Sequence, residues 1–304
     1  MFQILLQQML TMLTLAIFGF ALIKSKTIDS EGTRQISTIL TMYVMPAAMI
    51  ASFHTDFDLS RLKLFGWAAI AAFLTVLSRI FLNYFVFDKN DRIAKYSVTF
   101  PNSGFFGIPI VTALIGIEGV FFMTAFIMIT NVMQWTYGQT LISGNRHSMS
   151  IKKLFLNPAM IGATIGLFLF ITQIALPPFI WKAVDSIAAL NTSLAMIVIG
   201  SYLANSNFKE IFTSRPAYKA ATMRLLITPF LAFIIIKLLP INNAEVELVL
   251  TIASVAPAAA NTAILGRLFG GDYKYGARIV VLTSLISILT IPFMIQFAQF
   301  IYAL

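Results

Sequence analysis

Hydrophobic stretches separated by short polar segments run along the whole chain. Each is close to the roughly 20 residues that a helix needs to cross the hydrocarbon core of a bilayer. Irregular backbone cannot face lipid, so the pattern predicts an all-α membrane protein with ten transmembrane helices. The stretches lie at about 4–23, 34–53, 64–86, 93–116, 118–141, 157–176, 181–204, 217–239, 245–269 and 276–301.

Composition indicates that lipid is the solvent of these helices. The chain has 304 residues, of which 59% are hydrophobic and 11% are charged, and its mean hydropathy is +0.86. A soluble protein carries about a quarter charged residues. A large soluble helical protein is therefore disfavoured.

The basic residues are distributed unevenly between the two sides of the predicted membrane domain. Fifteen lie in the connections after the first, third, fifth, seventh and ninth stretches, and the opposite side has four, Arg61, Lys63, Lys182 and Lys237. Lys and Arg accumulate in cytoplasmic loops, so the odd-numbered connections are predicted to be cytoplasmic and both termini to face outside. The net charge of +9 then reflects membrane topology, and no nucleic-acid partner is expected.

The ten stretches divide into two halves. Five lie within 1–141, a short basic connection follows at 142–156, and five more lie within 157–304. An odd number of spans in each half places the second half upside down relative to the first, which predicts two inverted five-helix repeats, an arrangement common among secondary transporters. The small residues of Gly162–Gly166 are typical of a helix-packing face instead.

Two of the stretches are interrupted near their middle. In the fourth, two prolines and two glycines fall within Pro101–Pro109, and in the ninth, Pro257 is followed by three alanines and Asn261. Proline removes a backbone donor and clashes with the preceding turn, and glycine permits conformations that other residues avoid. A continuous helix is therefore not expected through either segment, and such breaks persist in a membrane where they line a cavity.

The two breaks together predict a site for an anion. A half-helix that begins after a break directs its positive dipole end and free N–H groups into the cavity. A lone proline is usually only a kink, but matched interruptions in both halves, each with an asparagine, favour a substrate site for a carboxylate. The predicted binding residues are Pro101, Asn102, Ser103, Gly104, Gly107, Pro109, Pro257, Ala260, Asn261 and Thr262.

Four further polar residues inside the spans have two interpretations each. Arg79 and Arg224 could extend towards the inner headgroups, or they could face the transport cavity and attract an anion. Asn131 and Gln134, in the fifth span, could bond neighbouring helices or form part of the cavity wall.

The sequence lacks the residues that several other functions require. It has no cysteine, its two histidines are in loops, and no acidic residue is placed centrally in a span. No catalytic residue, metal site or cofactor is expected. The missing carboxylates leave a facilitative carrier and a sodium- or proton-coupled carrier both open. A channel, which broken helices can also line, and a membrane receptor are alternatives.

The segments Pro101–Pro109 and Ala256–Thr262 resemble the auxin efflux carrier family, whose bacterial members include malate permeases and whose distant relatives include the plant PIN auxin exporters. Asn157-Pro158 and Ile199-Gly200 are also similar to that family. The resemblance is specific at the two breaks and covers the rest of the chain in the number and order of spans.

This resemblance implies a fold like that of the bile-acid sodium symporters and the sodium/proton antiporters. Spans 1, 2, 6 and 7 would form a scaffold through which two copies form a homodimer. Spans 3–5 and 8–10 would form a transport domain that moves as an elevator, with a small organic anion held where spans 4 and 9 cross. The expected location is the bacterial inner membrane.

Overall fold

The computed structural model describes residues 2–145, 156–269 and 271–303, so most of the predicted connection at 142–156 lies outside the described residues. Within them the chain is helical, with no strand beyond one isolated bridge. Seven helical segments are long and apolar enough to cross a bilayer, and two shorter apolar helices accompany them. The prediction of a multi-pass, all-helical membrane protein is confirmed at this level.

Residues 2–145 contain eight α-helices and three π-helical segments: α1 (Phe2–Lys24), α2 (Ser30–Ile39), η1 (Leu40–Val44), α3 (Met45–Ser52), α4 (Leu59–Val86), α5 (Arg92–Thr99), η2 (Ser103–Gly107), α6 (Ile108–Leu114), α7 (Ile117–Met133), η3 (Gln134–Gly138) and α8 (Gln139–Ser143). The second part comprises α10 (Pro158–Thr172), α11 (Pro178–Ala188), α12 (Asn191–Ala204), α13 (Phe208–Thr213), α14 (Arg215–Thr222), η5 (Met223–Ile227), α15 (Thr228–Leu238), α16 (Ala244–Val255), α17 (Asn261–Leu268) and α18 (Tyr273–Ala303).

The ten predicted stretches fall on helical segments, but several are not single long helices. The stretch at 93–116 is split into α5 and η2–α6, and the stretch at 245–269 into α16 and α17, as the prolines predicted. The sixth stretch is shorter than expected, because α10 ends at Thr172 and Gln173 adopts a left-handed conformation (φ 52°). The seventh has a turn between α11 and α12 that the hydrophobic pattern did not indicate.

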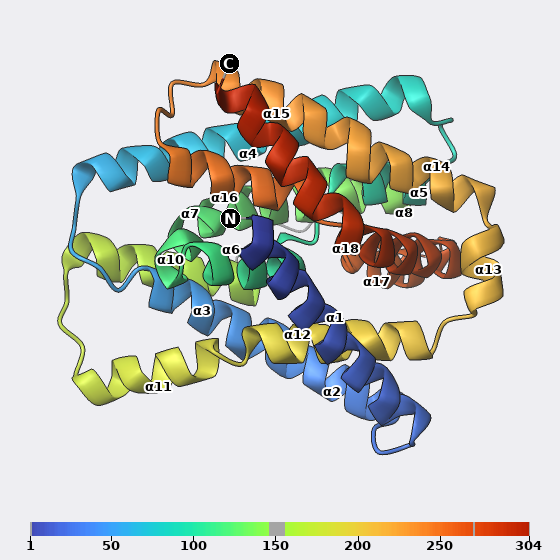
Figure 1. Cartoon of the computed structure of the whole chain (residues 1–304), viewed down its shortest axis with the longest axis horizontal. Helices are drawn as coiled ribbons and strands as arrows, with labels where there is room; N and C mark the ends of the chain where they lie inside the picture. Colours follow the sequence, from blue (N-terminus) through green and yellow to red (C-terminus); the bar gives the residue numbers. More distant parts are fainter. Residues whose placement is uncertain (1, 146–155, 270, 304) are drawn as a thin grey trace.

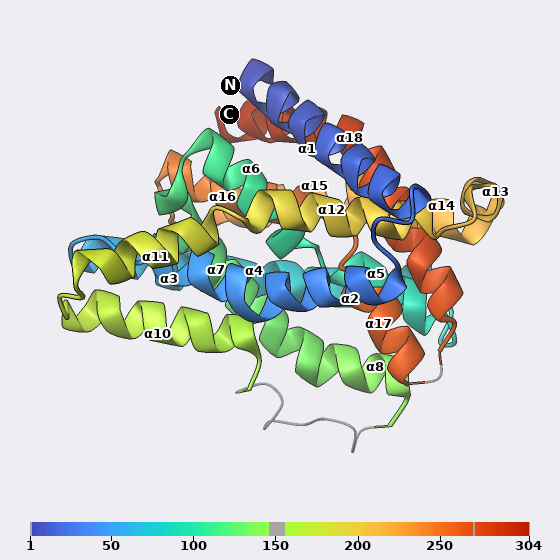
Figure 2. The ribbon, with the colours of Figure 1, turned by 90° about the horizontal axis from the view of Figure 1, so that it is seen from below.

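Connections of the two predicted sides lie at opposite ends of the molecule. In Figures 1 and 2 the links after α1, α4 and α12 are at one end of the long axis, at the right. The links after α3, α10 and α15 are at the other end. The α1–α2 and α4–α5 connections, which contain Lys26 and Lys89, therefore lie at one end of the helices, together with α13, which contains Lys209.

Close helix packing depends on glycines at two contacts. A Cβ at Gly200 of α12 would overlap the carbonyl oxygen of Ala16 on α1, and one at Gly19 would lie 2.5 Å from the carbonyl oxygen of Ile197. On the other contact, a Cβ at Gly162 of α10 would lie 2.6 Å from the Cα atom of Pro46 on α3. The predicted packing role of the Gly162–Gly166 face is confirmed.

We expect Gly200→Ala to destabilise the protein, because the added methyl group meets backbone, which cannot rotate away. Overpacking of this kind costs roughly 1–3 kcal/mol. Gly66→Ala on α4 is the matched control, since no atom lies within 4 Å of its Cβ position. Thermal unfolding of the purified protein in detergent should show a lower Tm for Gly200→Ala alone; equal values for both variants would contradict the packing.

Candidate functional site

The two broken spans cross and pair through their backbones. The Asn102 amide donates to the carbonyl oxygen of Pro257 at 2.8 Å, and the Ala259 amide donates to that of Phe100 at 3.0 Å. Pro101 and Ala258 lie opposite each other as an isolated antiparallel bridge. A buried backbone group must find a hydrogen-bond partner. Each break therefore supplies hydrogen-bond partners for backbone groups of the other break that no longer bond within their own helix.

The two half-helices that begin after the breaks start differently. Asn102 caps η2, because its Oδ1 atom accepts a hydrogen bond from the Phe105 amide at 3.3 Å. Asn261 is the first residue of α17 and makes no such cap; its neighbour Ala260 holds the cap position without a side-chain bond. The Ala258 amide is met instead by Thr283 Oγ1 of α18, at 3.2 Å. The side chain of Asn261 is thus left to bond elsewhere.

The structure brings together only part of the predicted set. Asn102, Pro257 and Asn261 lie at the crossover with Pro101 and Ala260, whereas Gly104, Gly107 and Pro109 continue away along η2 and α6. Cβ atoms at Gly104 and Gly107 would meet the methionine side chains of Met45 and Met123. Pro109 contributes its carbonyl oxygen to Gln8 Nε2 on α1, at 3.2 Å.

Two predicted hydroxyl residues are buried beside the breaks. Ser103 Oγ donates to the Ala253 carbonyl oxygen at 3.4 Å, which joins η2 to α16. Thr262 is fully buried, and its Oγ1 atom has no hydrogen-bond partner, as is also true of Ser254 Oγ on α16. The crossover therefore contains hydroxyl oxygens whose bonding capacity is not used.

Arg224 lies inside the protein and caps the carbonyl end of α16. Its guanidinium is fully buried and donates five hydrogen bonds. Nε and Nη2 reach Ala256 O at 2.9 and 2.8 Å, and Nη2 also reaches Ser254 O at 2.7 Å. Nη1 reaches Val98 O and Thr228 Oγ1, each at 3.3 Å. A cation at the C-terminal end of a helix interacts favourably with the helix dipole.

Arg79 makes the corresponding contacts from α4, with fewer and longer bonds. It too is fully buried, and it donates to Thr99 O at 3.3 Å and to Ser254 O at 3.4 Å. Each arginine thus binds the half-helix of its own part of the chain and reaches one carbonyl of the other part. The two carbonyls that are reached across the halves, those of Val98 and Ser254, each lie three residues before the proline of their break.

Both arginines are therefore part of the crossover. Their side chains do not extend along α4 or η5 towards the lipid headgroups, so that interpretation of the two arginines is wrong. No carboxylate neutralises them: the ion pairs among the described residues are Glu31–Arg34, Arg61–Glu118 and Glu210–Arg278.

A buried polar network joins the second break to the fifth span. Gln134 Oε1, at the start of η3, accepts hydrogen bonds from Asn261 Nδ2 at 2.8 Å and from the Tyr96 hydroxyl at 2.9 Å. Asn131 lies half-buried just before it on α7. Sequence reasoning missed Tyr96, whose position on α5, five residues before Pro101, is the one signal that could have indicated it.

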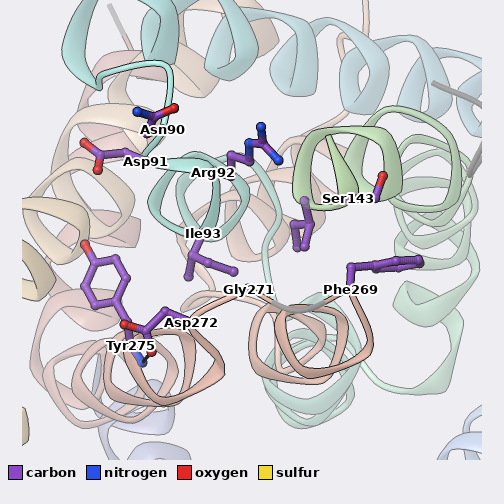
Figure 3. A pocket seen from close by; sticks show the side chains of 10 residues that line it. Asn90, Asp91, Arg92, Ile93, Ser143, Phe269, Gly271, Asp272 and Tyr275 are labelled. Atoms are coloured by element: carbon purple, nitrogen blue, oxygen red, sulfur yellow. Dashed lines mark hydrogen bonds between the residues drawn. The ribbon is translucent and has the colours of Figure 1, made fainter. Parts of the chain in front are cut away.

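A pocket of about 340 Å³ lies at the far ends of the half-helices rather than at the crossover. Figure 3 shows Asn90, Asp91 and Arg92, around the start of α5, across from Asp272 and Tyr275, at the start of α18. The crossover is at the opposite end of α5, an eight-residue helix that spans about 12 Å. None of the predicted binding residues lines this pocket.

Comparison with known proteins agrees with this architecture. The chain matches the family described as membrane transport protein over residues 4–295. It is also similar to an uncharacterized transporter of Methanocaldococcus jannaschii, with 23% identity over 277 residues that cover 87% of this chain and 89% of the relative. The family match spans nearly all of the helices described above. This multi-pass membrane protein therefore belongs to the membrane transport protein family, the auxin efflux carrier family that its two break motifs predicted.

Proposed function

We propose that the protein is a secondary transporter that carries a small organic anion, held where the two broken spans cross. The observation that carries this proposal is the charge of the crossover: two buried arginines have no carboxylate partner among the described residues. Membership of a transport family argues against an enzymatic role.

The sign of the site follows from adding its charges. Each helix end carries about half an elementary charge, positive at the N-terminus and negative at the C-terminus. Two half-helices end and two begin at the crossover, so these partial charges cancel. The guanidinium groups of Arg79 and Arg224 remain. A buried positive charge is costly unless it is paired, and an anionic substrate would supply the missing charge.

An inverted repeat accounts for the symmetry of the site. In our proposal residues 1–141 and 157–304 are the two repeats, joined by the connection at 142–156. Three features support it: each half contributes a broken fourth span, an arginine from its third span, and the carbonyl three residues before its proline. Inverted repeats with substrate bound at broken helices are common in secondary transporters.

An elevator-type movement is supported by how the helices associate. The glycine contacts join α1 to α12 and α3 to α10, which belong to the proposed scaffold spans 1, 2, 6 and 7. Where α1 and α12 meet η2 and α18, a recess of about 20 Å³ is lined by apolar side chains, among them Met9, Met12 and Met196, with Ser284 as its polar member. Flexible methionine side chains adapt to changes in packing, which suits surfaces that slide. The scaffold helices would also form the homodimer.

We further propose that the protein lies in the bacterial inner membrane with its basic connections in the cytoplasm. The links after α1, α4 and α12, which are among these connections, lie at one end of the helices in Figure 1. A potential of 100 mV favours export of each negative charge by roughly 2.3 kcal/mol.

Sodium coupling is the second candidate, and a specific observation favours it. The unpartnered hydroxyl oxygens of Ser254 and Thr262 could contribute to a sodium site beside the breaks. Against it, the carbonyls of Ser254 and Ala256 already bind the Arg224 guanidinium, which supplies a fixed cation there. We therefore favour a carrier that needs no coupling ion.

Replacing either break asparagine should weaken anion transport. For Asn102→Ala and Asn261→Ala we expect kcat/KM for labelled pyruvate, succinate or malate in proteoliposomes to fall about 10- to 100-fold. This factor corresponds to the loss of one hydrogen bond to a charged group. Asn243→Ala is the control, because Asn243 also caps a helix, through Val246 N, but lies at the start of α16, away from the break. If both variants fold and transport the anion at the wild-type rate, the substrate does not bind at the crossover.

The arginines should be distinguishable by stability and by transport. Arg224→Gln should lower the Tm in detergent more than Arg79→Gln, because it removes five hydrogen bonds rather than two, and each unmet buried carbonyl costs about 1–3 kcal/mol. Both changes should raise KM for the anion, with partial recovery in the corresponding lysine variants. Arg278→Gln, which breaks a surface ion pair with Glu210, should change neither quantity. An unchanged KM in the glutamine variants would contradict the charge argument.

The coupling proposal is tested by ion replacement. Initial uptake rates measured with sodium, potassium or N-methylglucamine as the sole external cation, with a protonophore present, should agree. A rate that saturates with sodium concentration would establish the coupled alternative. Accelerated exchange of labelled for unlabelled anion would distinguish a carrier from a channel.

A further inference from the structure

One oxygen atom at the second break accepts hydrogen bonds from both broken spans. Gln134 Oε1 accepts from the Tyr96 hydroxyl of α5 at 2.9 Å and from Asn261 Nδ2 of α17 at 2.8 Å. An amide oxygen has two lone pairs, so this atom is fully used. The Gln134 side chain itself comes from a third segment, η3, and Gln134 is only 5% exposed.

The arrangement of the two donors is what a carboxylate oxygen requires. A hydroxyl and an amide N–H₂ group, fixed on separate half-helices, converge on a single acceptor position. Hydrogen bonds to an ionised acceptor are roughly twice as strong as those between neutral groups. A carboxylate that reaches this position would therefore bind both donors more strongly than the neutral amide does.

The segment that carries Gln134 is π-helical and packs closely against Tyr96. η3 (Gln134–Gly138) is π-helical, between the α-helical α7 and α8, and π-helical turns within α-helices occur frequently at functional sites. At its other end Gly138 lies directly against the rings of Tyr96 and Phe100, where a Cβ would come within 2.7 and 2.9 Å. The same segment therefore contacts Tyr96 twice, once through its ring and once through its hydroxyl.

We propose that the Gln134 side chain is an internal occupant of the carboxylate position, and that Tyr96 and Asn261 are the residues that bind the substrate there. The inference rests on the proposed function and deepens it. When an anion arrives, the Gln134 amide withdraws and the two donors transfer to the substrate. When the anion leaves, the amide returns, so that two buried donors are never left without an acceptor.

This exchange has a consequence for the transport cycle. An unpaired buried donor is costly, and an empty carrier must cross the membrane without substrate. With Gln134 in place, the empty carrier keeps its donors bonded while it returns. Removing this acceptor should therefore slow net uptake, which requires the empty carrier to return, and spare exchange, in which the carrier crosses loaded in both directions.

The test compares wild type, Tyr96→Phe, Gln134→Met and the double variant in proteoliposomes, with each labelled acid of the set pyruvate, succinate and malate that the wild type takes up. We expect Gln134→Met to lower KM for exchange severalfold and to reduce the ratio of net uptake to exchange. Tyr96→Phe should raise KM about tenfold, the value of a hydrogen bond to a charged group, in both the wild-type and the Gln134→Met background. Gln139→Met is the control: Gln139 is also buried, but its amide oxygen has no partner, and the change should alter neither KM nor the ratio.

Two results would overturn the inference while leaving the proposed function intact. If Tyr96→Phe has no effect in the Gln134→Met background, Tyr96 acts only by holding Gln134. If Gln134→Met raises KM with an unchanged ratio of net uptake to exchange, Gln134 is itself a substrate ligand. Absence of saturable uptake by the wild type for all three acids would overturn the proposed function first, and the inference with it.

Discussion

The structure depends on satisfying the backbone of two helices that stop in the middle of a membrane protein. Lipid offers no hydrogen bonds, so each unmet amide or carbonyl would cost several kcal/mol. The two breaks solve this problem jointly, through the backbone pairing of Asn102 with Pro257 and of Ala259 with Phe100. Two arginines then meet carbonyls at the ends of α5 and α16. Neither broken helix could keep this conformation without the other.

The way in which the carbonyls are met also determines the charge of the site. Neutral donors could have bonded these carbonyls. The guanidinium groups instead add two positive charges that no acidic residue offsets in the part of the chain that the structure describes. A structural requirement of the backbone thus leaves an electrostatic requirement for an anion. Three of the segments at this site, η2, η3 and η5, are π-helical, and they carry Ser103, Gln134 and Arg224. The wider π-helical turns direct these side chains into the site, whereas a regular α-helix would direct them elsewhere.

The sequence predicted the features that depend on local chemistry. Proline at 101 and 257 interrupts a helix in any context, and the Gly162–Gly166 pattern indicates close packing, so the broken spans and the α10–α3 contact could be foreseen. The family could be foreseen from the break motifs. The role of Arg79 and Arg224 could not, because it depends on carbonyls that lie far away in the chain and approach only after folding. Tyr96 was missed for the same reason: its partner Gln134 belongs to another span. The π-helical segments have no simple sequence signal.

The most direct test of the account is an experimental map of the protein in lipid nanodiscs at saturating malate, determined by cryo-electron microscopy. We expect density for the anion at the crossover, in contact with Asn261 and Tyr96 and with the Gln134 side chain displaced. Density in the pocket at the start of α5, with the crossover unchanged from its state without malate, would contradict it.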